Sequence, residues 1–201
     1  MSVLFVAAAA FGIWAFGQRQ DYKNNVDQKI VAANQVAVKA EDAKKDAEFA
    51  EASKNPLKTY NGPSDFGSIS LQYPKTWSAY VDEQGGTATV TGYFYPNVVP
   101  SLTASTSVFA LRLQVVNQQY SSVLQPYSNF IKLGQATATP YKLPKLSSVV
   151  GTRIDGKIAN NKTGSVVILP LRDKTIEIWT ESNQFLNDFN TYILPNFTFS
   201  P

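Results

Sequence analysis

The sequence predicts an α+β protein, in which a long N-terminal helix precedes an antiparallel-sheet domain with packed helices. The first sign is an uncharged stretch of 16 residues, Ser2–Gly17, that continues into an Ala-rich, charged segment without proline or glycine up to Ser53. The second is a change after residue 65, where β-branched and aromatic residues alternate with polar ones and turn residues recur, as in antiparallel strands. We expect four parts: 1–17, a hydrophobic membrane or assembly helix; 18–54, a polar helical stalk; 55–65, a linker; and 66–201, the α+β domain.

The first segment is apolar or small throughout. As a helix its 16 residues span about 24 Å, somewhat less than the bilayer's hydrocarbon core of about 30 Å. Three interpretations stay open: a single-pass anchor in the lipid bilayer, which we prefer, a cleaved signal peptide, and a helix buried in a filament core. The larger apolar side chains of this segment are Val3, Leu4, Phe5, Val6, Phe11, Ile13, Trp14 and Phe16.

The stalk is predicted to be one helix that ends before Pro56, because the residue before a proline disfavours the helical conformation. Small and apolar residues recur along it at a mean spacing of about 3.5, which is coiled-coil spacing. This pattern predicts self-association through an alanine seam, and the alternative is a lone helix supported by i,i+4 ion pairs such as Glu41–Lys45. The seam contains Tyr22, Val26, Ile30, Ala33, Ala37, Ala40 and Ala47, together with Ala43 and Ala50.

The domain after the linker is predicted to be an antiparallel meander with helices packed on it. Strands are expected where apolar and polar residues alternate, and helices where longer apolar repeats end at a proline. Asp155-Gly156 is expected to form a tight turn or a bulge. We expect strands at 69–73, 87–95, 108–116, 148–154, 166–171 and 175–180, and helices at 120–133, kinked at Pro126, and at 185–192, stopped by Pro195.

Three sequence pieces of this domain resemble the PsbP-like superfamily, which is named for an extrinsic subunit of photosystem II. They are YPKTW at 73–77, the late DG pair, and the closing FLNDFNTYILPNFTF at 185–199. The resemblance covers about residues 66–199 and implies an α/β/α-type sandwich around an antiparallel sheet, with no fixed active site to carry over. Separately, the N-terminal segment followed by QDYKNN resembles small envelope proteins of candidate-phyla bacteria with reduced genomes.

The orientation in the envelope follows from two opposing observations. No lysine or arginine precedes the apolar segment, whereas Arg19, Lys23 and Lys29 follow it. Taken alone, the positive-inside rule would place the C-terminal domain in the cytoplasm. We nevertheless expect an extracytoplasmic domain at the cell surface, because the resemblance implies that side in bacteria.

Composition excludes several kinds of chemistry. The chain has no cysteine and no histidine, so disulfides, thiolate metal sites and Ser–His or Cys–His pairs are ruled out. The net charge is +3 with both signs interspersed, and no basic run suits nucleic acid. We therefore expect no catalytic residue, no cofactor, no bound metal and no nucleic-acid partner.

Two clusters in the domain contain residue types that occur in functional sites. Glu177 and Glu181 share one face of a predicted strand with Trp179 between them, but four residues separate them by about 13 Å, too far for a glycosidase pair. We interpret both as surface strand residues. Tyr93, Phe94 and Tyr95 form an aromatic run in which alternation buries one or two members, and the remainder could form an exposed patch for an envelope protein or a glycan.

The predicted function is non-enzymatic. We expect a single-pass envelope protein that displays an extracytoplasmic binding or scaffolding domain. The alternative is a pilin-like subunit of a surface filament, with the N-terminal helices packed in the fibre core. Against the alternative, mature pilins have a glutamate near position 5, where this chain has Phe5.

Overall fold

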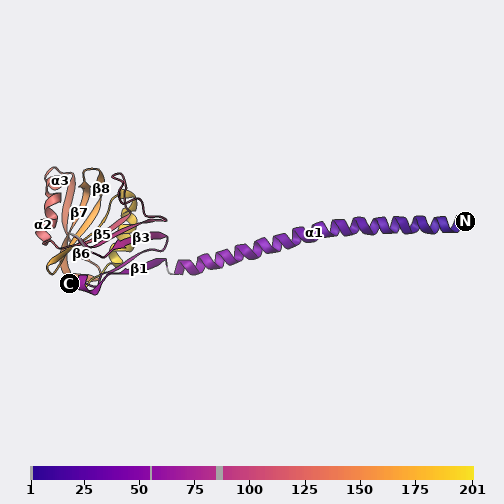
Figure 1. Cartoon of the computed structure of the whole chain (residues 1–201), viewed down its shortest axis with the longest axis horizontal. Helices are drawn as coiled ribbons and strands as arrows, with labels where there is room; N and C mark the ends of the chain where they lie inside the picture. Colours follow the sequence, from indigo (N-terminus) through magenta and orange to yellow (C-terminus); the bar gives the residue numbers. More distant parts are fainter. Residues whose placement is uncertain (1, 55, 85–87) are drawn as a thin grey trace. The chain divides into compact units, whose positions relative to one another are not determined.

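The chain divides into two compact units, residues 1–55 and 56–201, each described here by itself. The structure is a computed structural model that describes the backbone of residues 2–54, 56–84 and 88–201 (Figure 1). Side chains are described for 9–20, 23, 25–26, 28–48, 56–84 and 88–201. Among the predicted site residues, the side chains of Val3, Leu4, Phe5, Val6 and Tyr22 lie outside these ranges.

Unit 1 is a single continuous helix, α1 (Ser2–Lys54), as the absence of proline and of glycine after Gly17 predicts. Within the part of the chain that the structure describes, no helix is long and apolar enough to cross a bilayer. The expected single-pass span is therefore not found.

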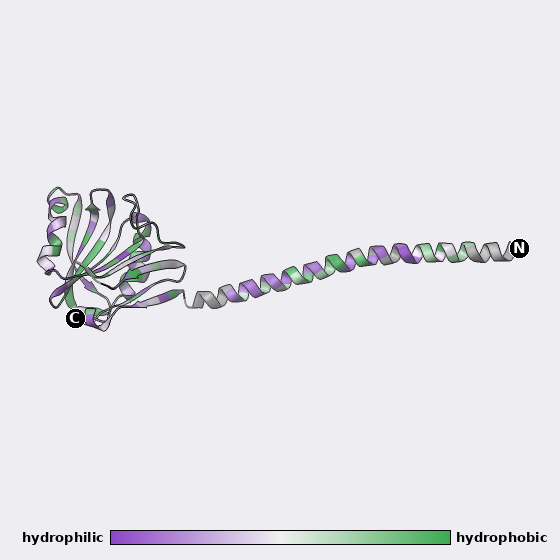
Figure 2. Cartoon of the chain, viewed as in Figure 1, coloured by the Kyte–Doolittle hydropathy of each residue, from purple (hydrophilic) through white to green (hydrophobic). Residues whose placement is uncertain are grey.

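Apolar side chains on α1 are exposed rather than gathered on a covered face. Figure 2 shows hydrophobic and hydrophilic residues following one another along the helix. Two ion pairs, Glu41–Lys45 at 2.8 Å and Lys44–Glu48 at 3.8 Å, join charges one turn apart within the helix. The predicted seam residues Val26, Ile30, Ala33, Ala37, Ala40 and Ala47 lie on this one helix, and their association with a partner stays a prediction.

Unit 2 is built on a seven-stranded antiparallel sheet in the order β3-β4-β5-β9-β8-β7-β6. The chain runs through β3–β5, crosses to the far edge, and returns through β6–β9 to pair β9 with β5. A separate antiparallel pair is formed by β1 (Leu57–Asn61) and β2 (Ser70–Pro74). The strands of the large sheet are β3 (Trp77–Asp82), β4 (Ala88–Pro96), β5 (Leu111–Val116), β6 (Ala136–Leu143), β7 (Leu146–Ala159), β8 (Lys162–Leu171) and β9 (Lys174–Thr180).

One face of the sheet carries the main core. Alternate residues of β5, β8 and β9 meet there, and the β2 residues and the C-terminal segment cover them. Because side chains alternate along a strand, the same strands present a second set of residues to the other face. The fully buried members of the main core include Leu71, Phe94, Leu113, Leu169, Ile178, Phe189 and Phe197.

Short helices cover parts of both faces, so the predicted α+β class with packed helices is confirmed. The C-terminal turns contact β2 and β8 on the main-core face, and the middle helices contact β6, β7, β8 and β9 on the other. The helical segments are η1 (Ser64–Phe66), α2 (Tyr120–Leu124), η2 (Gln125–Tyr127), α3 (Ser128–Lys132), η3 (Asn183–Phe185), α4 (Leu186–Asp188), η4 (Phe189–Ile193) and η5 (Leu194–Asn196).

Three local expectations are corrected. Residues 57–61, predicted as linker, form β1, because their backbone pairs with β2. Asp155-Gly156 is not a hairpin turn, since both residues lie inside β7 and pair with β6 and β8 on either side. The strand β6 was not predicted, because its sequence ATATPYKL has no clear alternation and only its two ends are buried. The predicted Gly85-Gly86 turn lies outside the described residues.

Candidate binding face

A row of aromatic and cationic side chains crosses the sheet on the face opposite the main core. Strand register places Tyr80 of β3 beside Tyr93 of β4, Tyr93 beside Arg112 of β5, and Arg112 beside Trp179 of β9. The helices α2, η2 and α3 pack on β6–β9, and the hydrophobic cluster that they cover also includes Val116 at the end of β5. We name Tyr80, Tyr93, Arg112 and Trp179 the aromatic row.

Arg112 is the centre of this row. Its guanidinium carbon lies 3.8 Å from the centroid of the Tyr93 ring and 4.8 Å from that of Trp179. A third ring, that of Phe109, has its centroid at 5.3 Å. Arginine stacks on aromatic faces because its planar cation is attracted by the ring quadrupole and is weakly hydrated. Burial lowers the pKa of Arg112 from its ordinary value, against the opposing effects of Tyr93 and Glu181.

Glu181, just past the end of β9, binds Arg112 and Trp179 through its carboxylate. Only 4% of Glu181 is exposed. Its Oε1 accepts hydrogen bonds from Arg112 Nη1 and from Trp179 Nε1, each at 3.3 Å. Its Oε2 accepts from Lys162 Nζ at 2.5 Å and from the backbone N–H of Phe109 at 3.0 Å. One buried carboxylate therefore joins β5, β8, β9 and the loop before β5.

The hydrogen bonds of this cluster hold its side chains in fixed positions. Glu181 accepts four hydrogen bonds, two of them from cations, and these occupy most of the acceptor positions of its two oxygens. Charge-assisted bonds of this kind order the side chains that they join.

A second carboxylate, that of Glu177, lies four residues before Glu181 in the chain. Glu177 accepts a hydrogen bond of 3.2 Å from the hydroxyl of Tyr127, at the end of η2. Burial raises the pKa of Glu177, and the hydroxyl of Tyr127 and the charge of Arg112 oppose the shift. Burial also raises the pKa of the Tyr127 phenol, with Glu177 adding to the effect. This pair closes the side of the row that faces the helices.

The predicted aromatic patch is divided by the alternation of β4. Phe94 is fully buried in the main core, so its place in an exposed patch is wrong. Its ring packs edge-on against Tyr73 with centroids 4.8 Å apart. Tyr93 and Tyr95 are half-buried, and Tyr95 packs against the main core. Tyr93 belongs to the aromatic row, whereas Tyr95 packs against Phe185 at 5.6 Å.

The interpretation of Glu177 and Glu181 as surface residues is wrong as well. Both lie on one strand face as predicted, but Glu181 is buried and Glu177 is half-buried. Arg112, Lys162 and Phe109 were not predicted as site residues, because they come from other strands and an irregular loop. One feature of the sequence pointed to Arg112: it is a charged residue between the apolar Leu111 and Leu113, so alternation places it on the face of β5 opposite these leucines.

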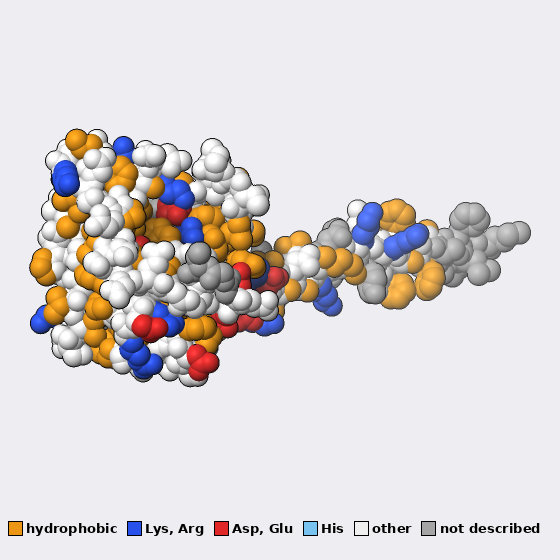
Figure 3. Space-filling model, turned by 60° about the vertical axis from the view of Figure 1, so that its left-hand side comes forward, with side chains coloured by type: hydrophobic (Ala, Val, Ile, Leu, Met, Phe, Trp, Pro, Cys, Tyr) orange, Lys and Arg blue, Asp and Glu red, His pale blue; other side chains and the backbone are white. Residues whose placement is uncertain are grey.

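The aromatic row is open to solvent at its β3 end. Tyr80 is 50% exposed, and the loop that follows β4 carries Val98 and Leu102 exposed as well. Figure 3 shows a hollow in unit 2 where basic and acidic side chains gather among hydrophobic ones. Elsewhere on unit 2 a depression of about 310 Å³ lies between the β1–β2 pair and the C-terminal helices, lined by Pro56, Leu57, Pro74, Thr76, Trp77, Asp188 and Tyr192.

No group of three or more acidic side chains that could hold a metal ion lies among the described residues. A scan against protein-family models gives no match. A search of curated proteins gives none either.

A similar solved structure is the solution structure of cyanobacterial PsbP (CyanoP) from Synechocystis sp. PCC 6803. The similarity covers 72% of this chain and 92% of that protein, with 10% sequence identity and a TM-score of 0.40. The expected PsbP-like resemblance is therefore found as a similarity of structure only. With 10% identity and a TM-score of 0.40, this similarity gives no information about activity or partners.

Proposed function

We propose that this chain is a non-enzymatic binding protein whose unit 2 recognises a partner protein of the cell envelope through the aromatic row. The observation that carries the proposal is Arg112 held against Tyr93 and Trp179, with the half-exposed Tyr80 beside them. Tyrosine, tryptophan and arginine are the residue types most enriched among the energetically dominant residues of protein interfaces.

The buried cluster below the row supports this function. The Glu181 carboxylate accepts hydrogen bonds from Arg112, Trp179 and Lys162. The aromatic row is therefore ordered before a partner binds. A preordered surface loses less conformational freedom on association. The same saturated hydrogen bonding supports a role without catalysis, since a reacting carboxylate needs free capacity.

The test is photo-crosslinking in the intact cell, with a photoreactive phenylalanine analogue at Tyr80. The matched control carries the analogue at Leu133, which is 62% exposed after α3 and lies outside the row. A defined adduct from position 80 and not from position 133, containing a peptide after digestion, supports the proposal. An adduct that contains a sugar, or equal adducts from both positions, contradicts it.

The extracytoplasmic location is part of the proposal and has its own test. Protease added to intact cells should remove unit 2 while a cytoplasmic marker protein stays whole. If unit 2 is digested only after the cells are opened, it lies inside the cell, and this part of the proposal is wrong.

A second candidate function, the filament subunit, is favoured by a different observation. Ile30, Val31 and Val36 of α1 are each more than half exposed, and a helix with apolar residues on several sides is normally buried among neighbours. Shearing cells distinguishes the two candidates. Release in high-molecular-weight fibres supports the filament, and retention with detergent-soluble membranes contradicts it.

A further inference from the structure

The two edges of the seven-stranded sheet are built differently. β6 lies at one edge and β3 at the other. β6 contains Pro140, which has no N–H to donate, and Lys142, and its pairing with β7 is shifted between Tyr141 and Leu143. Proline, lysine and bulges are the means by which natural sheets prevent a further strand from adding to an edge. β3, with the sequence WSAYVD, has none of them and pairs with β4 without a shift.

The pairing of β3 with β4 shows which backbone groups of β3 face outward. The N–H of Asn97 donates to the carbonyl oxygen of Thr76 at 3.0 Å, which extends the β3–β4 ladder by one pair. Hydrogen-bonded and non-bonded pairs alternate along an antiparallel ladder. The next pair, Trp77 opposite Pro96, is therefore a non-bonded one, in agreement with the missing N–H of proline. The outward-facing N–H and C=O groups of the strand belong to Trp77, Ala79 and Val81.

These outward groups, which we name the β3 edge, lie on an exposed strand. In the described part of the chain, none of them makes a hydrogen bond to a segment outside the large sheet. Ala79 is exposed, and Tyr80 beside it is 50% exposed. An exposed row of unpaired backbone donors and acceptors is a template for the pairing of another strand.

The β3 edge fits an antiparallel copy of itself. A two-fold axis at Ala79 places this residue opposite Ala79 of a second copy, and Trp77 opposite Val81 of that copy. Every outward residue of one strand then meets an outward residue of the other, and each such pair can exchange two hydrogen bonds. The side chains at the axis are small methyl groups, so they allow the two strands to approach each other.

Charges at the two ends of the strand support the same register. Lys75 precedes β3, Glu83 follows it, and both are exposed. Each lies four residues from Ala79, on opposite sides, so the two-fold axis brings Lys75 of one copy opposite Glu83 of the other. Opposite charges in opposed positions stabilise paired strands, whereas a parallel copy would bring like charges together.

From these observations we propose that two copies of this chain pair through the β3 edge into a symmetric dimer with one continuous sheet. The pairing places Tyr80 of one copy opposite Ser78 of the other, so the two aromatic rows lie on the same face of the joined sheet. The inference goes beyond the binding function of unit 2. It is tested on the purified chain, which contains no envelope partner, so the dimer and the recognition of a partner can fail separately.

The test is sedimentation velocity of the purified full chain over a range of concentrations. The wild type should dimerise, and Ala79→Pro should weaken the dimer by about tenfold or more, because each copy loses an outward donor at the axis. This N–H makes no bond to β4, so the sheet itself should stay intact, as circular dichroism would show.

The matched control is Ala138→Pro, which places the same residue at the other edge. The N–H of Lys157 donates to the carbonyl oxygen of Gln135 at 3.0 Å, so the N–H of Ala138 faces outward from β6, like the proline nitrogen at Pro140. Ala138 is exposed, as Ala79 is. The control should dimerise like the wild type, and a control that weakens the dimer as much as Ala79→Pro contradicts the proposal.

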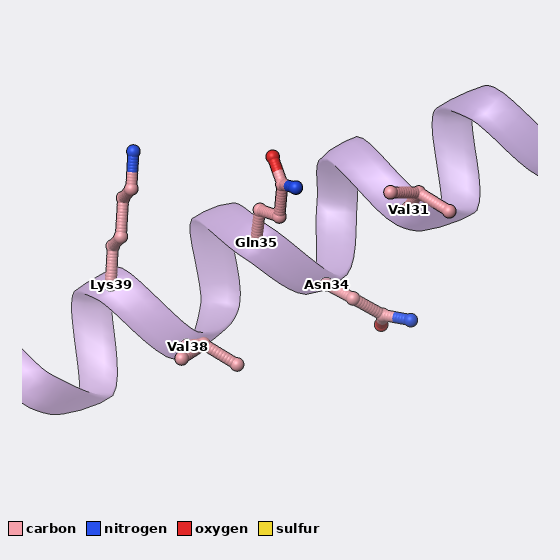
Figure 4. A pocket seen from close by; sticks show the side chains of 5 residues that line it. All are labelled: Val31, Asn34, Gln35, Val38 and Lys39. Carbon is pink, nitrogen blue, oxygen red and sulfur yellow. The ribbon is translucent and has the colours of Figure 1, made fainter.

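Association through α1 has to be distinguished, because this helix also exposes apolar side chains. Figure 4 shows Val31 and Val38 along α1, beside Asn34, Gln35 and Lys39. Copies joined through the helix would stay associated in Ala79→Pro. Association that this variant leaves unchanged overturns the proposal, and so does a monomeric wild type.

A charge exchange tests the pairing without a change in the strand itself. Lys75→Glu should weaken the dimer by about fivefold or more, because the two-fold axis turns two attractions into two repulsions. Glu83→Lys should weaken it in the same way. The double variant, Lys75→Glu with Glu83→Lys, should restore the affinity of the wild type. A double variant weaker than either single variant contradicts the antiparallel register.

A disulfide gives an independent readout of the register. Because the chain contains no cysteine, Ala79→Cys provides one thiol per copy. In the proposed dimer the two Cα atoms at this position lie about 5.5 Å apart, a separation that a disulfide can span. Mild oxidation should therefore give a covalent dimer with Ala79→Cys and not with Tyr80→Cys, although Tyr80 is the neighbouring residue. Crosslinking at position 80 and not at 79 would show another register and overturn the proposal.

Discussion

Glu181 Oε2 accepts the backbone N–H of Phe109 at 3.0 Å, although 72 residues separate the two in the chain. Together with the contacts of Glu181 to Arg112 and Lys162, this bond ties an irregular loop to three strands. Phe109 itself packs edge-on against Tyr93, with ring centroids 4.9 Å apart. The aromatic row therefore owes its geometry to one buried carboxylate.

Glu181→Gln should destabilise unit 2 strongly. The substitution leaves two cations near the surface of the core without their anion, and removing one partner of a buried ion pair costs about 3–5 kcal/mol. The measurement is urea unfolding followed by near-ultraviolet circular dichroism. Asp173→Asn is the matched control, because Asp173 pairs with Lys174 at 2.9 Å on the surface, where solvent screens the pair and its contribution to stability is small. Equal effects of the two variants would contradict the role of Glu181.

Two adjacent residues of β4 should behave oppositely on substitution by alanine. Phe94→Ala should lower the free energy of unfolding by about 3–5 kcal/mol, because it empties a fully buried site. Tyr93→Ala should cost less stability but weaken partner binding by about tenfold or more, because it removes a wall of the Arg112 site. Unfolding curves and the binding isotherm of the crosslinked partner measure both. A loss of binding with Phe94→Ala alone would contradict this assignment.

Gly164→Ala should destabilise the β8–β9 pair by several kcal/mol. A Cβ at this position would lie 2.0 Å from the carbonyl oxygen of Thr180, which is backbone and cannot rotate away. Gly12→Ala is the control, because a Cβ there meets nothing within 4 Å and alanine favours the helix by about 1 kcal/mol. Thermal unfolding of both variants tests this, and a Gly164→Ala protein as stable as wild type would show the close approach to be wrong.

Glu177 should make unit 2 less stable as pH rises through the acidic range. Burial raises its folded-state pKa above the ordinary value of 4.5, so the folded state binds more protons than the unfolded state in this window. The free energy of unfolding therefore falls as pH increases above about 4.5, until the folded group is fully ionised. Urea unfolding between pH 4 and 7 should show this slope in the wild type and a smaller one in Glu177→Gln. Identical slopes in the two proteins would contradict the prediction.

Much of the backbone could be predicted from the sequence because it depends on local patterns. The long helix follows from the absence of proline and glycine between Gln18 and Ser53, and the break at Pro126 appears as η2 between α2 and α3. The strands β8 and β9 follow from β-branched runs joined across Arg172-Asp173. The pairing of strands was harder to predict, because no local pattern in β1 or β6 shows which strand will lie beside it.

The sequence by itself determined the α+β class, the long N-terminal helix and the lack of histidine and cysteine chemistry, because composition and periodicity act at short range. Only the tertiary structure decided that Glu181 is buried, that Phe94 lies in the core and that Arg112 is held between rings. The physical reason is that burial and ion pairing depend on which strands become neighbours. A charged residue on a strand has the same local pattern whether solvent or a lysine from the next strand faces it.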